Sequence, residues 1–187
     1  MFLFQQFSGA NAILANLTAI MASSGLAMDP NLQSCMANLA QLIAILVPAL
    51  LVDFYGPRLF WLLSCVLLVI FLLFYATTTK ISFPSYTPVL CIFLYRLAFG
   101  FGMGPLTYAA WVQLLTENVR AIGCTIMMSV HWFISWVVVI TFTEMNENIG
   151  RFNTVIVYAI STFIAIFFGI FFVPGSPIKE TGEMALI

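Results

Sequence analysis

The sequence predicts an all-α membrane protein that crosses the bilayer with six transmembrane helices. Hydrophobic residues make up 63% of its 187 residues and charged residues only 7%, whereas soluble domains contain about 25% charged residues. The apolar residues gather into six blocks, each close to the about 20 residues that a helix needs to cross a hydrocarbon core. These observations argue strongly against a soluble fold and predict an integral, multi-pass membrane protein.

Charged and turn residues separate the six blocks. The predicted spans cover approximately residues 2–27, 33–52, 59–77, 87–112, 121–143 and 152–173. The connections are short, which predicts that consecutive helices run antiparallel. Residues 174–187 form a polar tail. Lys and Arg are slightly more numerous at the end of the bundle that carries this tail, so the positive-inside rule predicts a cytoplasmic tail.

Several function classes are disfavoured by the composition. The net charge of −1 provides no basic surface, so nucleic acid is not an expected partner. The sequence contains no HExxH, GxSxG or P-loop motif, and a single histidine does not build a metal centre. We therefore expect neither an enzyme nor a cofactor. The four cysteines are widely spaced and are interpreted as small apolar side chains.

The first dozen residues contain three amide side chains, Gln5, Gln6 and Asn11. An amide without a hydrogen-bond partner is costly in a bilayer, so these side chains are expected to face a polar cavity or the interior of the bundle. On an ideal helix Gln6 and Asn11 project about 140° apart. We therefore expect the helix to loosen between them, at Ser8-Gly9. The block favours a carrier for a polar, uncharged solute.

The second and fourth blocks contain further irregular residues. Gln41 is a mid-span amide, and Pro48 predicts a kink below it. Gly104 is followed by Pro105, which removes a backbone donor and predicts a bend. Broken helices of this kind expose backbone groups to the substrates of carriers, but a packing kink without a ligand is an equal alternative. Arg96 is the one charged residue inside a block; it snorkels outward or serves the outer vestibule, and the sequence does not decide between these.

The fifth block contains the only histidine, His131, beside Trp132. His131 and Ser135 project about 40° apart on an ideal helix and so share a face. A tryptophan ring stacks well on the apolar face of a sugar while a histidine or serine bonds a hydroxyl. A buried histidine in a structural role is the alternative interpretation.

Four motifs together resemble one known family. They are QQFSGANA at residues 5–12, DFYGPR at residues 53–58, Gly104-Pro105 continuing to Glu117 and Arg120, and His131-Trp132. In this order and spacing they resemble the C-terminal half of the sugar porter family of the major facilitator superfamily, beginning inside the seventh helix. The resemblance covers essentially the whole chain.

The resemblance implies a carrier that binds a sugar between two six-helix halves and alternates its opening. The implied substrate-binding residues are Gln5, Gln6, Asn11, Gln41, Tyr108, His131 and Trp132. The implied gating residues are Asp53, Gly56, Arg58, Gly104, Pro105 and Arg120. The implied partners are the lipid bilayer, a sugar (a hexose or small disaccharide), and an N-terminal six-helix half or a full-length carrier. The family's usual location is the plasma membrane.

The chain also departs from the family pattern. Phe54 and Pro57 replace arginines, and Gln113 replaces the acidic residue that pairs with them, so the cytoplasmic ion pairs are lost. No Asp or Glu lies inside any block, which favours facilitative transport over proton coupling. Family members have twelve spans, and a six-helix half does not alternate access alone. The alternatives are a non-transporting sugar sensor or modulator of a full carrier, and an inactive degenerate fragment.

Overall fold

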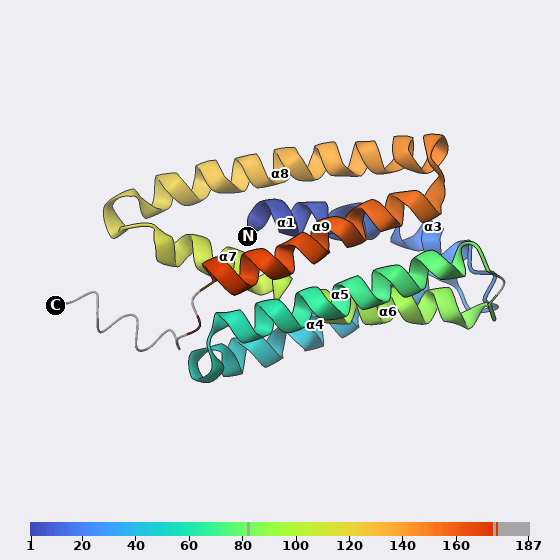
Figure 1. The fold of residues 1–187 in the computed structure, drawn as a ribbon, viewed down its shortest axis with the longest axis horizontal. Coiled ribbons are helices and arrows are strands. Elements are labelled where there is room, and N and C mark those ends of the chain that lie inside the picture. Colours follow the sequence, from blue (N-terminus) through green and yellow to red (C-terminus); the bar gives the residue numbers. More distant parts are fainter. Residues whose placement is uncertain (82, 174, 176–187) are drawn as a thin grey trace.

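The computed structural model describes residues 1–81, 83–173 and 175, and all regular structure in this part of the chain is helical (Figure 1). Within it, five stretches are long and apolar enough to cross a membrane. They are α4 (Pro30–Tyr55), α5 (Pro57–Thr78), α6 (Tyr86–Gly100) continued by α7 (Met103–Leu114), α8 (Glu117–Asn148) and α9 (Gly150–Phe172). The predicted cytoplasmic tail lies, apart from Gly175, outside the described residues. The chain is an all-α, multi-pass membrane protein.

The first predicted span is three short helices, α1 (Phe2–Phe7), α2 (Ala10–Ala15) and α3 (Leu17–Ala22). The predicted loosening at Ser8-Gly9 is confirmed, because Gly9 has a φ of 81°, which L-residues with a side chain rarely adopt. A β-carbon at Gly9 would also lie 2.8 Å from the Tyr158 ring of α9. A second break, at Asn16, is not predicted by the sequence.

The fourth predicted span is interrupted between α6 and α7, at Gly102. The break precedes Pro105, which lies in the first turn of α7. In the first turn of a helix a backbone N–H has no acceptor within the helix, so a proline, which lacks this N–H, is tolerated there. The break is held by Ser64 of α5, whose hydroxyl donates to the Ala98 carbonyl (2.7 Å) and accepts from the Met103 N–H (3.0 Å). The break thus lies where the Pro105 ring would clash with the carbonyl four residues earlier, that of Phe101, as predicted, and the contact with α5 adds to it.

The core is built around α5, which packs against both α6 and α9. Trp61, Cys65, Leu68 and Leu72 lie on one face of α5 and are fully buried, as residues three or four apart on a helix are expected to be. The Trp61 indole N–H donates to the carbonyl of Ala165 in α9 at 3.1 Å. This seam joins the two helices at the centre of the bundle.

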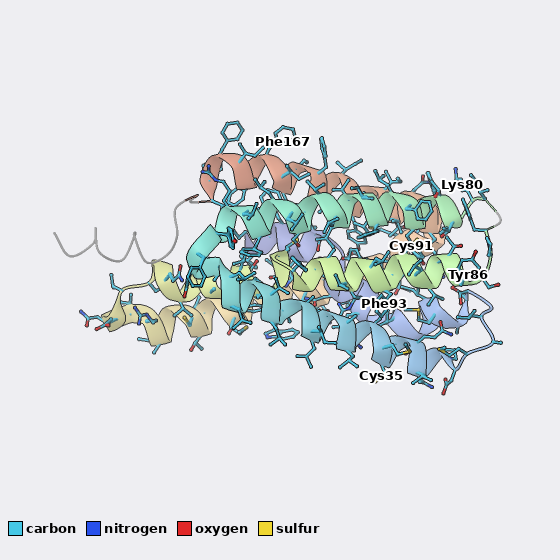
Figure 2. All side chains as sticks on the ribbon, turned by 90° about the horizontal axis from the view of Figure 1, so that it is seen from below. Cys35, Lys80, Tyr86, Cys91, Phe93 and Phe167 are labelled. Carbon is cyan, nitrogen blue, oxygen red and sulfur yellow. The ribbon has the colours of Figure 1, made fainter. Side chains whose placement is uncertain are left out.

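The outer helices present apolar side chains to the surroundings. α8 lies along one edge of the bundle (Figure 1) and exposes Trp132, Phe133 and Trp136, and Figure 2 shows Phe167 of α9 pointing away from the other helices. In water such a surface would be unfavourable, whereas in lipid it is the ordinary exterior of a spanning protein. Pro48 lies within α4, which the structure describes as one continuous helix, so the predicted kink does not interrupt it.

Candidate functional site

Four of the predicted substrate-binding residues form one hydrogen-bonded cluster. Gln6 of α1, Asn11 of α2, Tyr108 of α7 and His131 of α8 come from four helices. The Gln6 amide nitrogen Nε2 lies 2.9 Å from both ring nitrogens of His131 and donates to its backbone carbonyl at 3.3 Å. Asn11 Nδ2 donates to Gln6 Oε1 at 2.8 Å, and the Tyr108 hydroxyl lies 3.0 Å from His131 Nε2. We call these four residues the amide–imidazole cluster.

The amide–imidazole cluster runs from the interior of the bundle to an accessible edge. Gln6 and His131 are 0% and 1% exposed, whereas Asn11 is half-buried and Tyr108 is 36% exposed. Because these polar groups bond one another, their burial costs little in this arrangement. Every one of these bonds is also of a kind that a sugar hydroxyl can replace, since a hydroxyl both donates and accepts.

The break at Ser8-Gly9 is what brings Gln6 and Asn11 together. Gly9 turns the chain between α1 and α2 with its positive φ, and the Ser8 hydroxyl donates to the Gln5 carbonyl at 2.7 Å. The Tyr95 hydroxyl of α6 donates to the Ser8 carbonyl at 3.1 Å. The sequence predicts the break but not the hydrogen bond from Tyr95 to it. The only signal for Tyr95 in the sequence is its position in the middle of a predicted span.

Gln5 lies outside the cluster and joins α1 to α7. Its Nε2 donates to the Gly104 carbonyl at 3.2 Å, next to the helix break and Pro105. Its Oε1 is buried and makes no hydrogen bond to any described residue. Gly104 and Pro105, predicted to serve the gate, therefore lie beside α1 in the middle of the bundle.

The remaining predicted binding residues lie at two other places. Trp132 is 60% exposed, and its ring meets that of His131 edge-on, with centroids 5.7 Å apart. Gln41 lies where α4 crosses α6, since a β-carbon at Gly100 would be 2.6 Å from the Gln41 carbonyl oxygen. Trp132 therefore adjoins the cluster, and Gln41 belongs to a separate contact.

Four predicted gating residues lie near the turns at one end of the bundle, where α4 meets α5 and α7 meets α8 (Figure 1). Asp53 is exposed in the last turn of α4, and Gly56, with a φ of 78°, makes the turn into α5. Arg58 Nε donates to the Val173 carbonyl at 2.7 Å, and Arg120 Nε to the Leu115 carbonyl at 3.3 Å. Both arginines thus bond backbone carbonyls at helix ends, where cations are favoured.

Comparison with protein families identifies the chain. The model of the sugar (and other) transporter family matches residues 1–186. The chain belongs to this family. It is therefore a member of a family of membrane transporters and not of enzymes. The resemblance inferred from the four motifs is confirmed.

Curated relatives include sugar transporters of insects. The chain is 27% identical over 191 residues to the facilitated trehalose transporter Tret1 of Bombyx mori, covering 98% of this chain and 38% of that protein. It is 26% identical over 177 residues to Tret1 of Apis mellifera ligustica, covering 91% of this chain and 35% of that protein. The chain thus spans less than two fifths of the length of these relatives.

Solved structures of bacterial sugar symporters share the fold. The proton:xylose symporter XylE bound to 6-bromo-6-deoxy-D-glucose matches with a TM-score of 0.84 at 21% identity, over 98% of this chain and 41% of that one. A partially occluded inward-open form of XylE from E. coli matches with a TM-score of 0.74 at 23% identity, over 92% of this chain and 37% of that one. These likenesses establish a major facilitator fold.

Proposed function

We propose that this chain contributes to facilitative transport of a hexose or small disaccharide, as the C-terminal six-helix half of a twelve-helix carrier of the plasma membrane. The observation that carries the proposal is the amide–imidazole cluster, in which Gln6, Asn11, Tyr108 and His131 bond one another between four helices. A cluster of neutral donors and acceptors inside a membrane bundle suits a polyhydroxylated, uncharged part of a solute. The trehalose transporters among its relatives support the choice of a sugar.

Binding would exchange internal hydrogen bonds for bonds to sugar hydroxyls. Asn11 and Tyr108 are the accessible members of the cluster, so they meet the solute first and release Gln6 and His131 to bond it. Trp132, edge-on to His131 and 60% exposed, offers an apolar ring face on which a sugar ring can stack. The exchange conserves hydrogen bonds, so the net affinity comes from small differences between them.

Alternating access needs a second bundle, because binding at the interface of two repeats is what allows one half to rock against the other. The N-terminal half or a full-length carrier would supply this partner. The facilitative mechanism is supported by the absence of Asp and Glu from the six apolar blocks of the sequence, since these residues are the usual proton relays inside membranes.

The test is uptake of labelled glucose and trehalose by cells that make the natural gene product from its complete coding sequence. Gln6→Ala combined with Asn11→Ala should lower uptake about tenfold or more at equal surface abundance, because two hydrogen bonds to the solute are lost. Asn16→Ala is the matched control, since the Asn16 side chain bonds only the Ala12 carbonyl of its own segment among the described residues. Uptake by the double variant equal to that of the parent would refute the proposed site.

A further inference from the structure

Arg96 is a buried charge that the amide–imidazole cluster does not use. It is the one charged residue inside the six apolar blocks of the sequence, and its side chain in α6 is only 4% exposed. An ionisable residue inside a membrane is costly and requires a partner. The sequence supplies no acidic residue within any of these blocks, so none of the six blocks provides a counter-ion for this guanidinium.

The hydrogen bonds of Arg96 leave one edge of its guanidinium incompletely satisfied. Nη2 donates to Asn38 Oδ1 of α4 at 2.7 Å, while Nε is enclosed and bonds no described residue. Nε and Nη2 share the edge that binds a carboxylate or phosphate through two parallel hydrogen bonds. Asn38, a neutral amide on that edge, is itself exposed, so an anion can approach the edge where this amide now lies.

The Arg96–Asn38 contact lies beside a predicted sugar-binding residue. Asn38 and Gln41 are three residues apart and therefore share a face of α4. Gly100 follows Arg96 by one turn of α6, and a β-carbon there would lie 2.6 Å from the Gln41 carbonyl oxygen. Gln41 Oε1 is buried and has no hydrogen-bond partner among the described residues. The guanidinium edge of Arg96 and the unused acceptor of Gln41 thus lie about one helical turn apart along the contact between α4 and α6.

We propose that Arg96 binds the anionic group of a polyhydroxylated solute, such as the carboxylate of a hexuronate or the phosphate of a sugar phosphate. The anion takes the Nε–Nη2 edge in place of the Asn38 amide, and Gln41 accepts a hydrogen bond from a neighbouring hydroxyl. This inference rests on the proposed function and extends its substrate class from neutral sugars to acidic ones. The solute supplies the negative charge that these six blocks lack.

The experiment measures uptake of labelled glucuronate and labelled glucose by cells that make the natural gene product from its complete coding sequence. In the parent, glucuronate is carried and competes with glucose. Arg96→Gln should lower glucuronate uptake about tenfold or more, as expected for losing a hydrogen-bonded charge, while glucose uptake at equal surface abundance stays near that of the parent. Arg96→Lys keeps the charge but not the paired donors and should give an intermediate glucuronate uptake. Arg151→Gln, an exposed arginine at the start of α9, should change neither.

Other outcomes of this uptake experiment separate a failure of the inference from a failure of the proposed function. A parent that carries glucose, but neither carries glucuronate nor is inhibited by it, refutes the acidic substrate and leaves the proposed function intact. If Arg96→Gln reaches the surface and lowers both sugars equally, Arg96 serves the structure through some other anion. Should Arg96→Gln fail to reach the surface, Arg96→Lys and the competition measurement on the parent still decide. If the parent carries neither of these sugars nor trehalose, the proposed function fails and this inference with it.

Discussion

A methyl group at Gly102 should destabilise the protein more than a methyl group at any freely accessible glycine. The α-carbon of Gly102 faces α5 at the break between α6 and α7, and a β-carbon there would overlap the carbonyl oxygen of Phe60. It would also lie 2.7 Å from the Phe60 carbonyl carbon and 2.8 Å from Ser64 Cβ. Two of these three atoms are backbone, so the clash is relieved only if α5 and the α6–α7 break move apart.

The magnitude follows from two contributions. Overpacking of a well-packed contact costs about 1–3 kcal/mol. Moving α5 also stretches the bonds by which Ser64 holds the break, to the Ala98 carbonyl at 2.7 Å and from the Met103 N–H at 3.0 Å, and each such bond is worth about 1 kcal/mol. Gly102→Ala should therefore lower the free energy of unfolding by about 2–5 kcal/mol.

The assay is reversible unfolding of the purified protein in detergent micelles, followed by circular dichroism. The matched control is Gly123→Ala in α8, where the β-carbon would meet only the flexible end of Leu115 and the helix gains up to about 1 kcal/mol in propensity. An unfolding free energy for Gly102→Ala within error of that for Gly123→Ala would show that the α5 contact does not restrict this glycine, and the reasoning would be wrong.

Three further substitutions test other contacts by the same unfolding measurement. Gly9→Ala should cost about 2 kcal/mol or more, because it places a side chain at a φ of 81° and brings a β-carbon within 2.8 Å of the Tyr158 ring; a stability equal to the parent would contradict this. Trp61→Phe should cost about 1–3 kcal/mol by leaving a carbonyl of α9 without the indole N–H; an unchanged stability would show that this bond does not stabilise the bundle. Arg58→Gln should cost about 1 kcal/mol or less, because the residue is half-buried and loses one bond to the Val173 carbonyl; a loss larger than that of Trp61→Phe would refute this order.

The helix breaks show how much of the fold can be predicted from the sequence. The break at Ser8-Gly9 is predictable, because Gln6 and Asn11 project about 140° apart on an ideal helix and would not face one cavity, and the Gly at the turn tolerates a positive φ. The break at Gly102 is also predictable, because the Pro105 ring clashes with the carbonyl four residues earlier, that of Phe101. The sequence does not reveal the contact with α5, where the Ser64 hydroxyl accepts from the Met103 N–H.

The candidate site, too, is only partly predictable from the sequence. The sequence predicts Gln6, Asn11, Tyr108 and His131 as binding residues, through their polarity in an apolar setting and their place in family motifs. It does not reveal that Gln5 bonds the Gly104 carbonyl instead of joining them. Adjacent residues on α1 project in different directions, and which one faces α8 depends on how the helices pack.

The sequence by itself determined that this is a multi-pass helical membrane protein of a sugar transporter family. Hydrophobic length and charge are properties of each segment alone, and a bilayer selects spans by those properties without reference to their neighbours. Only the tertiary structure decided which polar groups meet. Gln6 and His131 are 125 residues apart, and Arg96 and Asn38 are 58 apart, so their contacts depend on the crossing and rotation of whole helices. Those are set by close approaches such as Gly100 on Gln41 and Gly102 on Phe60, which no single segment encodes.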